Sequence, residues 1–478
     1  MTHDVRLVPA AVAAWLAASV ALTVGAVGPV GLTGLAGATL LVLALLVRVV
    51  GSRPGRLALQ VLVCAAVAVA VLLSARAQLE ARLAGGFADL RAGRAEVEVH
   101  GVALEDARQL GPSSRSEAMV RLRLETASPA GGVAVRSVAR VTALGSLTGV
   151  RRGDRVVLAG TLAALPAWED SQALLLDSTV AARASPDGAA GAVQALRGRF
   201  LAATTSLSAQ GRGLVPGITI GDDSALPETL LEAMRRTSLG HLTAVSGAHI
   251  ALVLAAVGLL AVRASTRLRA VLLTLALAGL VALVGPEESV VRATAMGCAA
   301  VVAILRGRPP RALPALATGI VLLLVLDPWL AFSFGFALSA AATAALLLLA
   351  PALGRSAERY LRRAGWRPRR HVAGVLATPL AAHLACAPII LLFNPSVSLY
   401  GVLANAVAAP AVAPATLLGL AAVVASPVWL PGATGIARAA EFFTGWIAGT
   451  AMVVSRFPAS SLPWPQGLGG AMALAVLH

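Results

Sequence analysis

Long apolar segments recur along this chain and constrain its fold more than any other feature. The longest have about 20 residues, which is the length that an α-helix needs to cross a bilayer. Because 58% of the residues are hydrophobic and only 13% are charged, the pattern predicts a polytopic α-helical membrane protein with about ten transmembrane segments. The segments lie near residues 7–27, 30–50, 57–74, 241–262, 270–284, 290–305, 313–330, 332–349 and 372–392, with a Pro-interrupted stretch at 408–414 that suits a broken or re-entrant helix.

Clusters of arginine in the loops predict how these segments are oriented. Positively charged loops are retained in the cytoplasm, so we expect the N-terminus and the loop at 48–56 on that side. The chain then leaves the third segment on the outer side. The later clusters at 263–269, 306–311 and 355–370 fall on the cytoplasmic side in the same arrangement. The sequence therefore predicts a multi-pass protein of the cell (cytoplasmic) membrane, embedded in the lipid bilayer.

The chain contains arginine but no lysine, and this excludes some classes of function. All 39 basic side chains are arginine, and the formal charge is +16. Without lysine the chain forms neither a phosphate-binding P-loop nor a Schiff base. Energy for any transport must therefore come from a partner protein or an ion gradient. We expect no cofactor. Arginine bias also follows from a GC-rich genome, so the charge alone does not identify an anionic ligand.

Between residues 86 and 186 the pattern changes to short alternating stretches. Period-two alternation broken by Gly, Pro, Ser and Asp indicates strands, and this number of strands in about 100 residues suits a small all-β domain of the OB type. OB surfaces that bind single strands stack bases on aromatic side chains, but this region offers only Phe87 and Trp168. The candidate strands are 96–99, 120–124, 133–141, 156–162 and 173–180.

These patterns divide the chain into three parts. We predict N-terminal transmembrane helices in residues 1–76 and an inserted OB-like extracytoplasmic domain in residues 86–186. A second polytopic region then occupies residues 191–478. The charge bias of the loops puts the β domain outside the membrane.

Polar chemistry concentrates in residues 217–252, against the start of an apolar segment. Ionisable side chains at a membrane boundary cost free energy and tend to persist at functional sites. Asp222 precedes an amphipathic helix, so it either helps to seat a cation or interacts with the helix dipole. His241 and His249 are eight residues apart, so on one helix both face a similar direction, toward either the bundle interior or their own helix neighbours.

Two further candidates carry distinct chemistry. Ser246 and His249 have the i,i+3 spacing of a possible nucleophile and base, although no G-x-S-x-G elbow and no nearby acid accompany them. Arg292 lies at the start of an apolar segment, where a cation needs a partner or a solvated path. Glu288, four residues earlier, is the nearest candidate partner. Either the two residues form a structural ion pair or they line a path for a charged substrate.

Several short motifs follow one another in a specific order. Together they resemble the ComEC-type DNA-internalisation (competence) membrane proteins. The resemblance covers most of the chain and identifies residues 191–478 as a polytopic competence (channel) domain. The motifs are Gly221-Asp222, the helix at 230–237, Leu239-x-His241-Leu242, Ser246-Gly247-x-His249, Ser289-Val290-Val291-Arg292-Ala293, Asp327-Pro328, Gly335-Phe336-x-Leu338-Ser339, Leu403-Ala404-Asn405 and Pro410-x-x-x-Pro414.

The resemblance implies a membrane channel that imports single-stranded DNA during natural transformation. It also implies a surface DNA receptor and a cytoplasmic ATP-driven helicase-like motor as partners. Many relatives continue into a metallo-β-lactamase-like nuclease domain with a His-x-His-x-Asp-His motif. This sequence ends at His478 without that motif, so either the protein is truncated or split, or a nuclease acts in trans. We therefore assign no strand degradation to this polypeptide and expect the chain itself to be no enzyme. An oligomer is compatible with this function.

The sequence departs from the family pattern at two positions. Asp223 stands where a basic residue is expected after Gly-Asp, and Ala248 stands where Leu is usual before His249. Two other functions stay open: a transporter or flippase for another anionic envelope metabolite, and an intramembrane hydrolase that uses Ser246 and His249. The candidate DNA-path residues are Asp222, His241, Ser246, Gly247, His249 and Arg292, with no catalytic residue and no metal ligand assigned.

Overall fold

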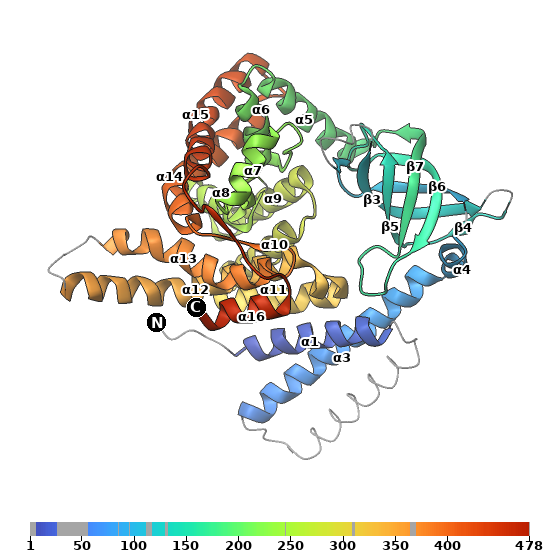
Figure 1. The fold of residues 1–478 in the computed structure, drawn as a ribbon, viewed down its shortest axis with the longest axis horizontal. Helices are drawn as coiled ribbons and strands as arrows, with labels where there is room; N and C mark the ends of the chain where they lie inside the picture. Colours follow the sequence, from blue (N-terminus) through green and yellow to red (C-terminus); the bar gives the residue numbers. More distant parts are fainter. Residues whose placement is uncertain are drawn as a thin grey trace. The chain divides into compact units, whose positions relative to one another are not determined.

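The computed structural model describes residues 6–25, 56–84, 86–94, 96–110, 117–129, 132–243, 245–307, 311–363 and 370–477. These residues form two compact units (Figure 1). One unit, here the β unit, contains the chain up to Gln194 together with Ile320–Ser333; the other, here the helical unit, contains Ala195–Gly319 and Phe334–His478. The apolar segment expected at 30–50 lies outside the described residues.

The β unit contains a seven-stranded sheet. Its longer strands close into a ring in the order β1-β3-β5-β7-β6, and β6 pairs with β1 again. Within that ring only the β5–β7 pair is parallel. The strands are β1 (Glu96–Ala103), β2 (Arg108–Gln109), β3 (Ala118–Pro129), β4 (Val135–Arg136), β5 (Arg140–Ser146), β6 (Arg155–Ala164) and β7 (Ala173–Ala184).

Alternation of apolar and polar residues explains these strands. Along β1, Val97 and Val99 are buried while their neighbours Glu96 and Glu98 are exposed, as a period of two requires. The buried side chains meet inside the ring in one core that also contains Phe87 of the short helix α4 (Phe87–Ala92). The candidate strands of this region are confirmed, with one correction.

The stretch expected as a single strand at 133–141 is interrupted. The buried hydroxyl of Ser137 donates to the carbonyl of Arg82 at 3.1 Å and accepts the backbone N–H of Ala139 at 3.1 Å. A serine side chain that binds the backbone competes with the strand ladder. The stretch therefore divides into β4 and β5.

Two long helices and one short segment complete the β unit. The helices are α1 (Val8–Gly25) and α3 (Arg56–Leu83). The end of α11 (Ala312–Leu326) and the 3₁₀ turn η2 (Pro328–Phe332) belong to this unit through Ile320–Ser333. The Ser74 hydroxyl donates to the carbonyl of Val325 at 2.5 Å, and the indole of Trp15 donates to that of Ala331 at 3.0 Å. These bonds tie a distant part of the chain to the N-terminal helices.

The helical unit contains the remaining helices. In Figure 1, α12 and α13 run side by side, as do α14 and α15. The elements are α5 (Gly188–Thr204), α6 (Ala209–Ile220), α7 (Glu228–Arg236), η1 (Gly240–Leu242), α8 (Gly247–Leu260), α9 (Thr266–Val284), α10 (Glu288–Leu305), α12 (Phe334–Arg363), α13 (Arg370–Ile390), α14 (Gly401–Ala425), α15 (Leu430–Val454) and α16 (Leu468–Leu477), with the short strands β8 (Ser396–Ser398) and β9 (Ser461–Pro463).

Small residues let the helices of this unit approach closely. Ala404 and Ala408 of α14 lie in one buried cluster with Ala448 and Ala451 of α15 and with Leu230 of α7. Small side chains at helix contacts are typical of membrane bundles. In lipid the hydrophobic effect does not bring helices together, so they associate through close van der Waals packing.

The length and apolar composition of its helices identify the chain as a membrane protein. Within the described residues, five helices are long and apolar enough to cross a bilayer: α3, α9, α10, α12 and α14. Shorter apolar helices include α8 and α11. The total of about ten transmembrane segments stays a prediction, as do the domain boundaries at 1–76, 86–186 and 191–478.

Two expectations about helix boundaries were wrong. The stretch at 408–414 is no break, because α14 runs continuously through Pro410 and Pro414; a proline removes one backbone donor, and packed neighbours allow a membrane helix to tolerate it. The segment expected as one helix at 241–262 begins as a helix only at Gly247, after the turn η1.

Candidate functional site

The loop after α6 holds the first candidate, Asp222. Helix α6 ends at Gly221, whose φ of 75° is in the left-handed region that glycine favours. The carboxylate of Asp222 accepts bonds from the backbone N–H and hydroxyl of Ser224 at 3.2 and 2.6 Å, and it lies 3.8 Å from the guanidinium of Arg197. Each of these contacts fixes the turn between α6 and α7, so the geometry gives Asp222 a role in shaping that turn.

His241 lies in the 3₁₀ turn η1 and is exposed. Its Nδ1 is 3.0 Å from the carbonyl of Ser238, a residue with a φ of 55°. His241 and His249 therefore belong to different elements, and the expectation that helical spacing turns them the same way was wrong. The polar residues between them end the first element before the second begins.

Ser246 and His249 meet at the start of α8. Ser246 is the N-cap residue, and its backbone N–H donates to Nδ1 of His249 at 2.8 Å. The Ser246 hydroxyl lies 3.0 Å from the same nitrogen. This is the geometry of a capping box, in which the third helical residue reaches back to the N-cap backbone. Nδ1 accepts the backbone proton, so in the neutral ring Nε2 carries the hydrogen.

That arrangement is poorly suited to nucleophilic catalysis. A serine nucleophile needs a base whose ring is oriented by a third polar group. Here Nε2 of His249 is buried and has no hydrogen-bond partner among the described residues. The Ser246–His249 pair is therefore explained by helix capping.

Arg292 is the arginine of the candidate set, and only 4% of its surface is exposed. From α10 its Nε and Nη2 both donate to the hydroxyl of Ser339 on α12, at 2.9 and 2.6 Å, and Nη1 lies 3.3 Å from the sulfur of Met296. The expected partner Glu288 is replaced by these two neutral groups. Their dipoles solvate the guanidinium, and no carboxylate of the described residues forms an ion pair with it, so its positive charge is not neutralised there.

Gly247 completes the contact between α8 and α10. A Cβ atom on Gly247 would lie 2.8 Å from Nη2 of Arg292, so the guanidinium lies directly against the first turn of α8. The hydroxyl of Ser289 donates to the carbonyl of Val245 at 3.0 Å and fixes the start of α10 beside the same turn. The first turn of a helix carries a partial positive charge. Two positive groups thus lie side by side in a membrane bundle.

The structure brings together four of the six candidates. Ser246, Gly247, His249 and Arg292 gather where α8 and α10 begin, whereas Asp222 and His241 make their hydrogen bonds within their own loops. Within the described residues, no group of three or more His, Cys, Asp or Glu side chains is arranged to hold a metal ion.

The same part of the chain has recognisable relatives. The family model described as "Competence protein" matches residues 218–478, which is more than half of the chain and includes this site. The chain belongs to the competence protein family. ComE operon protein 3 of Bacillus subtilis (strain 168) is 31% identical to it over 159 residues, or 33% of this chain and 20% of that protein. The chain thus matches only about a fifth of that relative's length. No solved structure matches it.

Sequence reasoning missed the partner of Arg292 in this competence protein. Ser339 lies 47 positions along the chain from Arg292, and it was noted only as the last residue of the Gly335-Phe336-x-Leu338-Ser339 motif. In the sequence, Ser339 is distinguished from its neighbours only as a hydroxyl side chain in an apolar helix. Such a group commonly bonds its own helix, and nothing local indicates a contact with another helix.

A second cluster of charges lies in the β unit and was also missed. Asp327 accepts a bond from Arg140 of β5 at 2.8 Å and lies 3.9 Å from Arg82 of α3. Arg140 also forms an ion pair with Asp170, and the guanidinium of Arg82 lies 3.6 Å from the ring centre of Trp329. Burial lowers the pKa of Arg140, but the carboxylates of Asp327 and Asp170 outweigh that effect and raise it. The Asp327-Pro328 motif thus anchors the loop after α11 to the β strands.

Proposed function

We propose that this chain is a membrane channel that imports single-stranded DNA across the cytoplasmic membrane during natural transformation. The observation that carries the proposal is the guanidinium of Arg292, which is buried between helices and bonded to neutral groups. A cation without a carboxylate partner favours an anion nearby. Single-stranded DNA carries a negative charge at each phosphate, so it is a substrate of the right sign.

The surroundings of Arg292 suit a polyanion that must move. A long anion passes over weak and dispersed donors, because tight binding at one point would stall it. The hydroxyl of Ser246 and the ring of His249 are neutral polar groups near the same turn, and Gly247 leaves room for the guanidinium. In this proposal Arg292 attracts phosphates while its neighbours position it.

The β unit contributes an OB-like extracytoplasmic domain in this proposal. Its closed ring of five strands, with one parallel pair, is the kind of small barrel that an OB fold forms. Within residues 86–186, Trp168 is the exposed aromatic side chain, with 42% of its surface accessible, whereas Phe87 is buried. One exposed ring is a poor stacking platform, so the domain acts as a spacer or docking surface more than as a DNA reader.

Import requires partners beyond this chain. The absence of lysine rules out a P-loop ATPase in this sequence, so a cytoplasmic ATP-driven helicase-like motor supplies the work. A surface DNA receptor delivers the duplex, and a nuclease outside residues 1–478 removes the second strand. The chain is then a multi-pass, non-enzymatic channel. One copy or several copies of the chain could line the path of the DNA.

The decisive experiment uses a naturally competent host in which the gene is deleted and then restored. Labelled double-stranded DNA is added, and label in the cytosol is counted separately from label held outside the membrane. We expect the deletion to abolish cytosolic label while external binding continues. Restoration with Arg292→Ala should fail, and restoration with Arg306→Ala should succeed, because Arg306 is an exposed arginine at the opposite end of the same helix.

Two results would change the assignment. Normal uptake in the deletion strain would favour a transporter for another anionic envelope metabolite, since a buried cation also suits a smaller anion. Normal uptake with Arg292→Ala would remove Arg292 from the DNA path while leaving the channel in place. A loss of uptake with Arg292→Ala supports the proposal only when that variant reaches the membrane at the level of the unaltered protein.

A further inference from the structure

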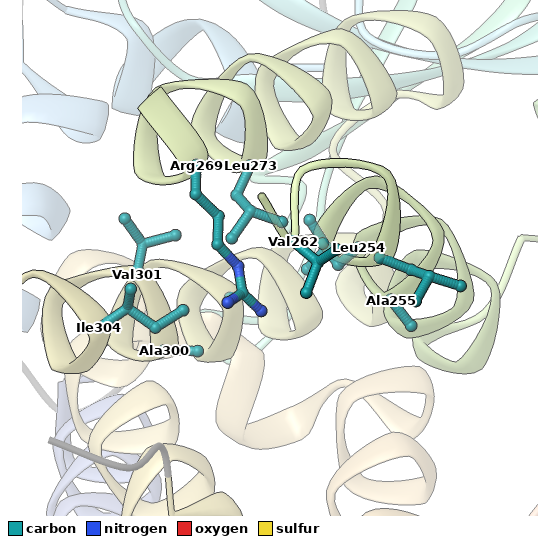
Figure 2. Close-up of a pocket in the computed structure, with 11 residues that line it drawn as sticks. Leu254, Ala255, Val262, Arg269, Leu273, Ala300, Val301 and Ile304 are labelled. Atoms are coloured by element: carbon teal, nitrogen blue, oxygen red, sulfur yellow. The ribbon is translucent and has the colours of Figure 1, made fainter. Parts of the chain in front are cut away.

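A pocket of about 410 Å³ lies between α8, α9 and α10, away from the Arg292 site. It occupies the opposite ends of these helices: the last turns of α8 and α10 and the first turn of α9. Figure 2 shows Arg269 reaching from α9 into the space between Val262 and Leu254 on one side and Ala300 and Ile304 on the other.

The walls of this pocket are aliphatic apart from one cation. Leu254, Leu273, Val301 and Ile304 supply much of the lining, and Arg269 is the charged member. Nε of Arg269 is buried and has no hydrogen-bond partner among the described residues. A buried donor without a partner costs free energy, so the pocket presents an unsatisfied positive group inside an apolar wall.

The surroundings of the pocket resemble the boundary between lipid and water. Leu260 and Val262, beside it, are 87% and 61% exposed, as is expected for side chains that face acyl chains. Arg263, Arg267 and Arg306 are exposed at the same helix ends. By the positive-inside rule these ends lie at the cytoplasmic face, where anionic lipid headgroups attract arginine.

We propose that this pocket binds an anionic phospholipid, with its phosphate on the guanidinium of Arg269 and one acyl chain along the aliphatic walls. The phosphate satisfies the free donors of Arg269 by charge-assisted hydrogen bonds. The acyl chain explains why the walls are apolar, which a free phosphate ion would not require. The charge of Arg269 inside the pocket favours an anionic headgroup over a zwitterionic one. This site is independent of the DNA path.

The test uses the purified full-length chain in lipid nanodiscs. Retained lipid is counted by native mass spectrometry, and thermal unfolding is followed in phosphatidylcholine alone and in mixtures with phosphatidylglycerol. We expect phosphatidylglycerol to be retained and to raise the unfolding temperature. Arg269→Gln should lower its retention about tenfold, the loss expected for one charge-assisted contact. Arg267→Gln, in the same helical turn but outside the pocket lining, should change retention by less than about twofold.

A second variant tests the apolar part of the site. Ala300→Phe fills the pocket but keeps every arginine, so it should displace the lipid as strongly as Arg269→Gln does. Three outcomes would overturn the proposal: equal losses with Arg269→Gln and Arg267→Gln, unchanged retention with Ala300→Phe, or equal retention of phosphatidylcholine. Inorganic phosphate is added in a parallel arm. Stabilisation by phosphate that requires Arg269 would instead identify a site for the free ion and would also overturn the lipid assignment.

Discussion

Gly247 and Arg292 are so close that a methyl group on the glycine would lie 2.8 Å from Nη2 of the arginine. Real Cβ atoms rarely approach another atom so closely, and the guanidinium would have to move. Its present position depends on two bonds to the hydroxyl of Ser339. The glycine therefore determines where the positive charge of this site lies.

We expect Gly247→Ala to reduce DNA uptake at least tenfold, because displacing the guanidinium breaks the contact with Ser339 and moves the charge off the path. Uptake of labelled DNA into the cytosol measures this effect. Gly279→Ala on α9 is the matched control, since a Cβ there meets no atom within 4 Å. Equal uptake by the two variants would separate Gly247 from the function of Arg292.

The contact between Arg292 and Ser339 predicts a thermodynamic coupling. Ser339→Ala leaves buried guanidinium donors without a partner and should destabilise the protein by about 1–3 kcal/mol. In an Arg292→Met background the same change should cost less than about 0.5 kcal/mol, because the donors are gone. Thermal unfolding of the four proteins in one detergent gives the cycle. A cost that is the same in both backgrounds would contradict the coupling.

Arg292→Met alone should distinguish function from stability. Arg292→Met removes a buried charge that is solvated only by neutral groups. The desolvation cost of that charge is then relieved, so the unfolding temperature should hold or rise. DNA uptake should nevertheless be lost, because methionine attracts no phosphate. If the variant unfolds early and is absent from the membrane, a structural role for Arg292 explains the phenotype.

Ser246 should tolerate residues that cap a helix but cannot act as nucleophiles. Ser246→Asn is therefore expected to retain uptake, whereas Ser246→Ala should lose about 1 kcal/mol of stability from the start of α8. Both variants are assayed for uptake and for thermal unfolding. Loss of function in Ser246→Asn with normal stability would revive the intramembrane hydrolase.

Asp327→Asn should weaken the β unit. The change removes the negative charge that Arg140 and Arg82 face, and a partly buried charged hydrogen bond is worth about 1–3 kcal/mol. Glu80→Gln is the control, because its exposed pair with Arg76 on α3 should contribute less than about 0.5 kcal/mol. Limited proteolysis measures opening of the unit. We expect faster cleavage in Asp327→Asn only, and indistinguishable rates would argue against an anchoring role.

Local patterns were enough to identify the elements. The alternation around Val97 and Val99 predicted a strand there, and the apolar run after Arg56 predicted a helix, because each depends on neighbours a few residues apart. Boundaries were less secure. The predicted segment began at residue 241, whereas α8 begins at Gly247. The prediction was too early because it followed hydrophobicity and did not use Ser246 as the capping residue.

Family membership was also available from the sequence, because the motifs keep their order along the chain. The sequence named Ser246, Gly247, His249 and Arg292 as candidates, but it did not predict that these four residues lie together. It also did not predict the partners of the buried charges. Spacing suggested Glu288 for Arg292, but the structure uses Ser339 from another helix, and Asp327 meets Arg140 across 187 positions. Helix and strand formation follow from local periodicity, whereas the partner of a buried charge is decided by which elements pack together. Only the tertiary structure contains that information.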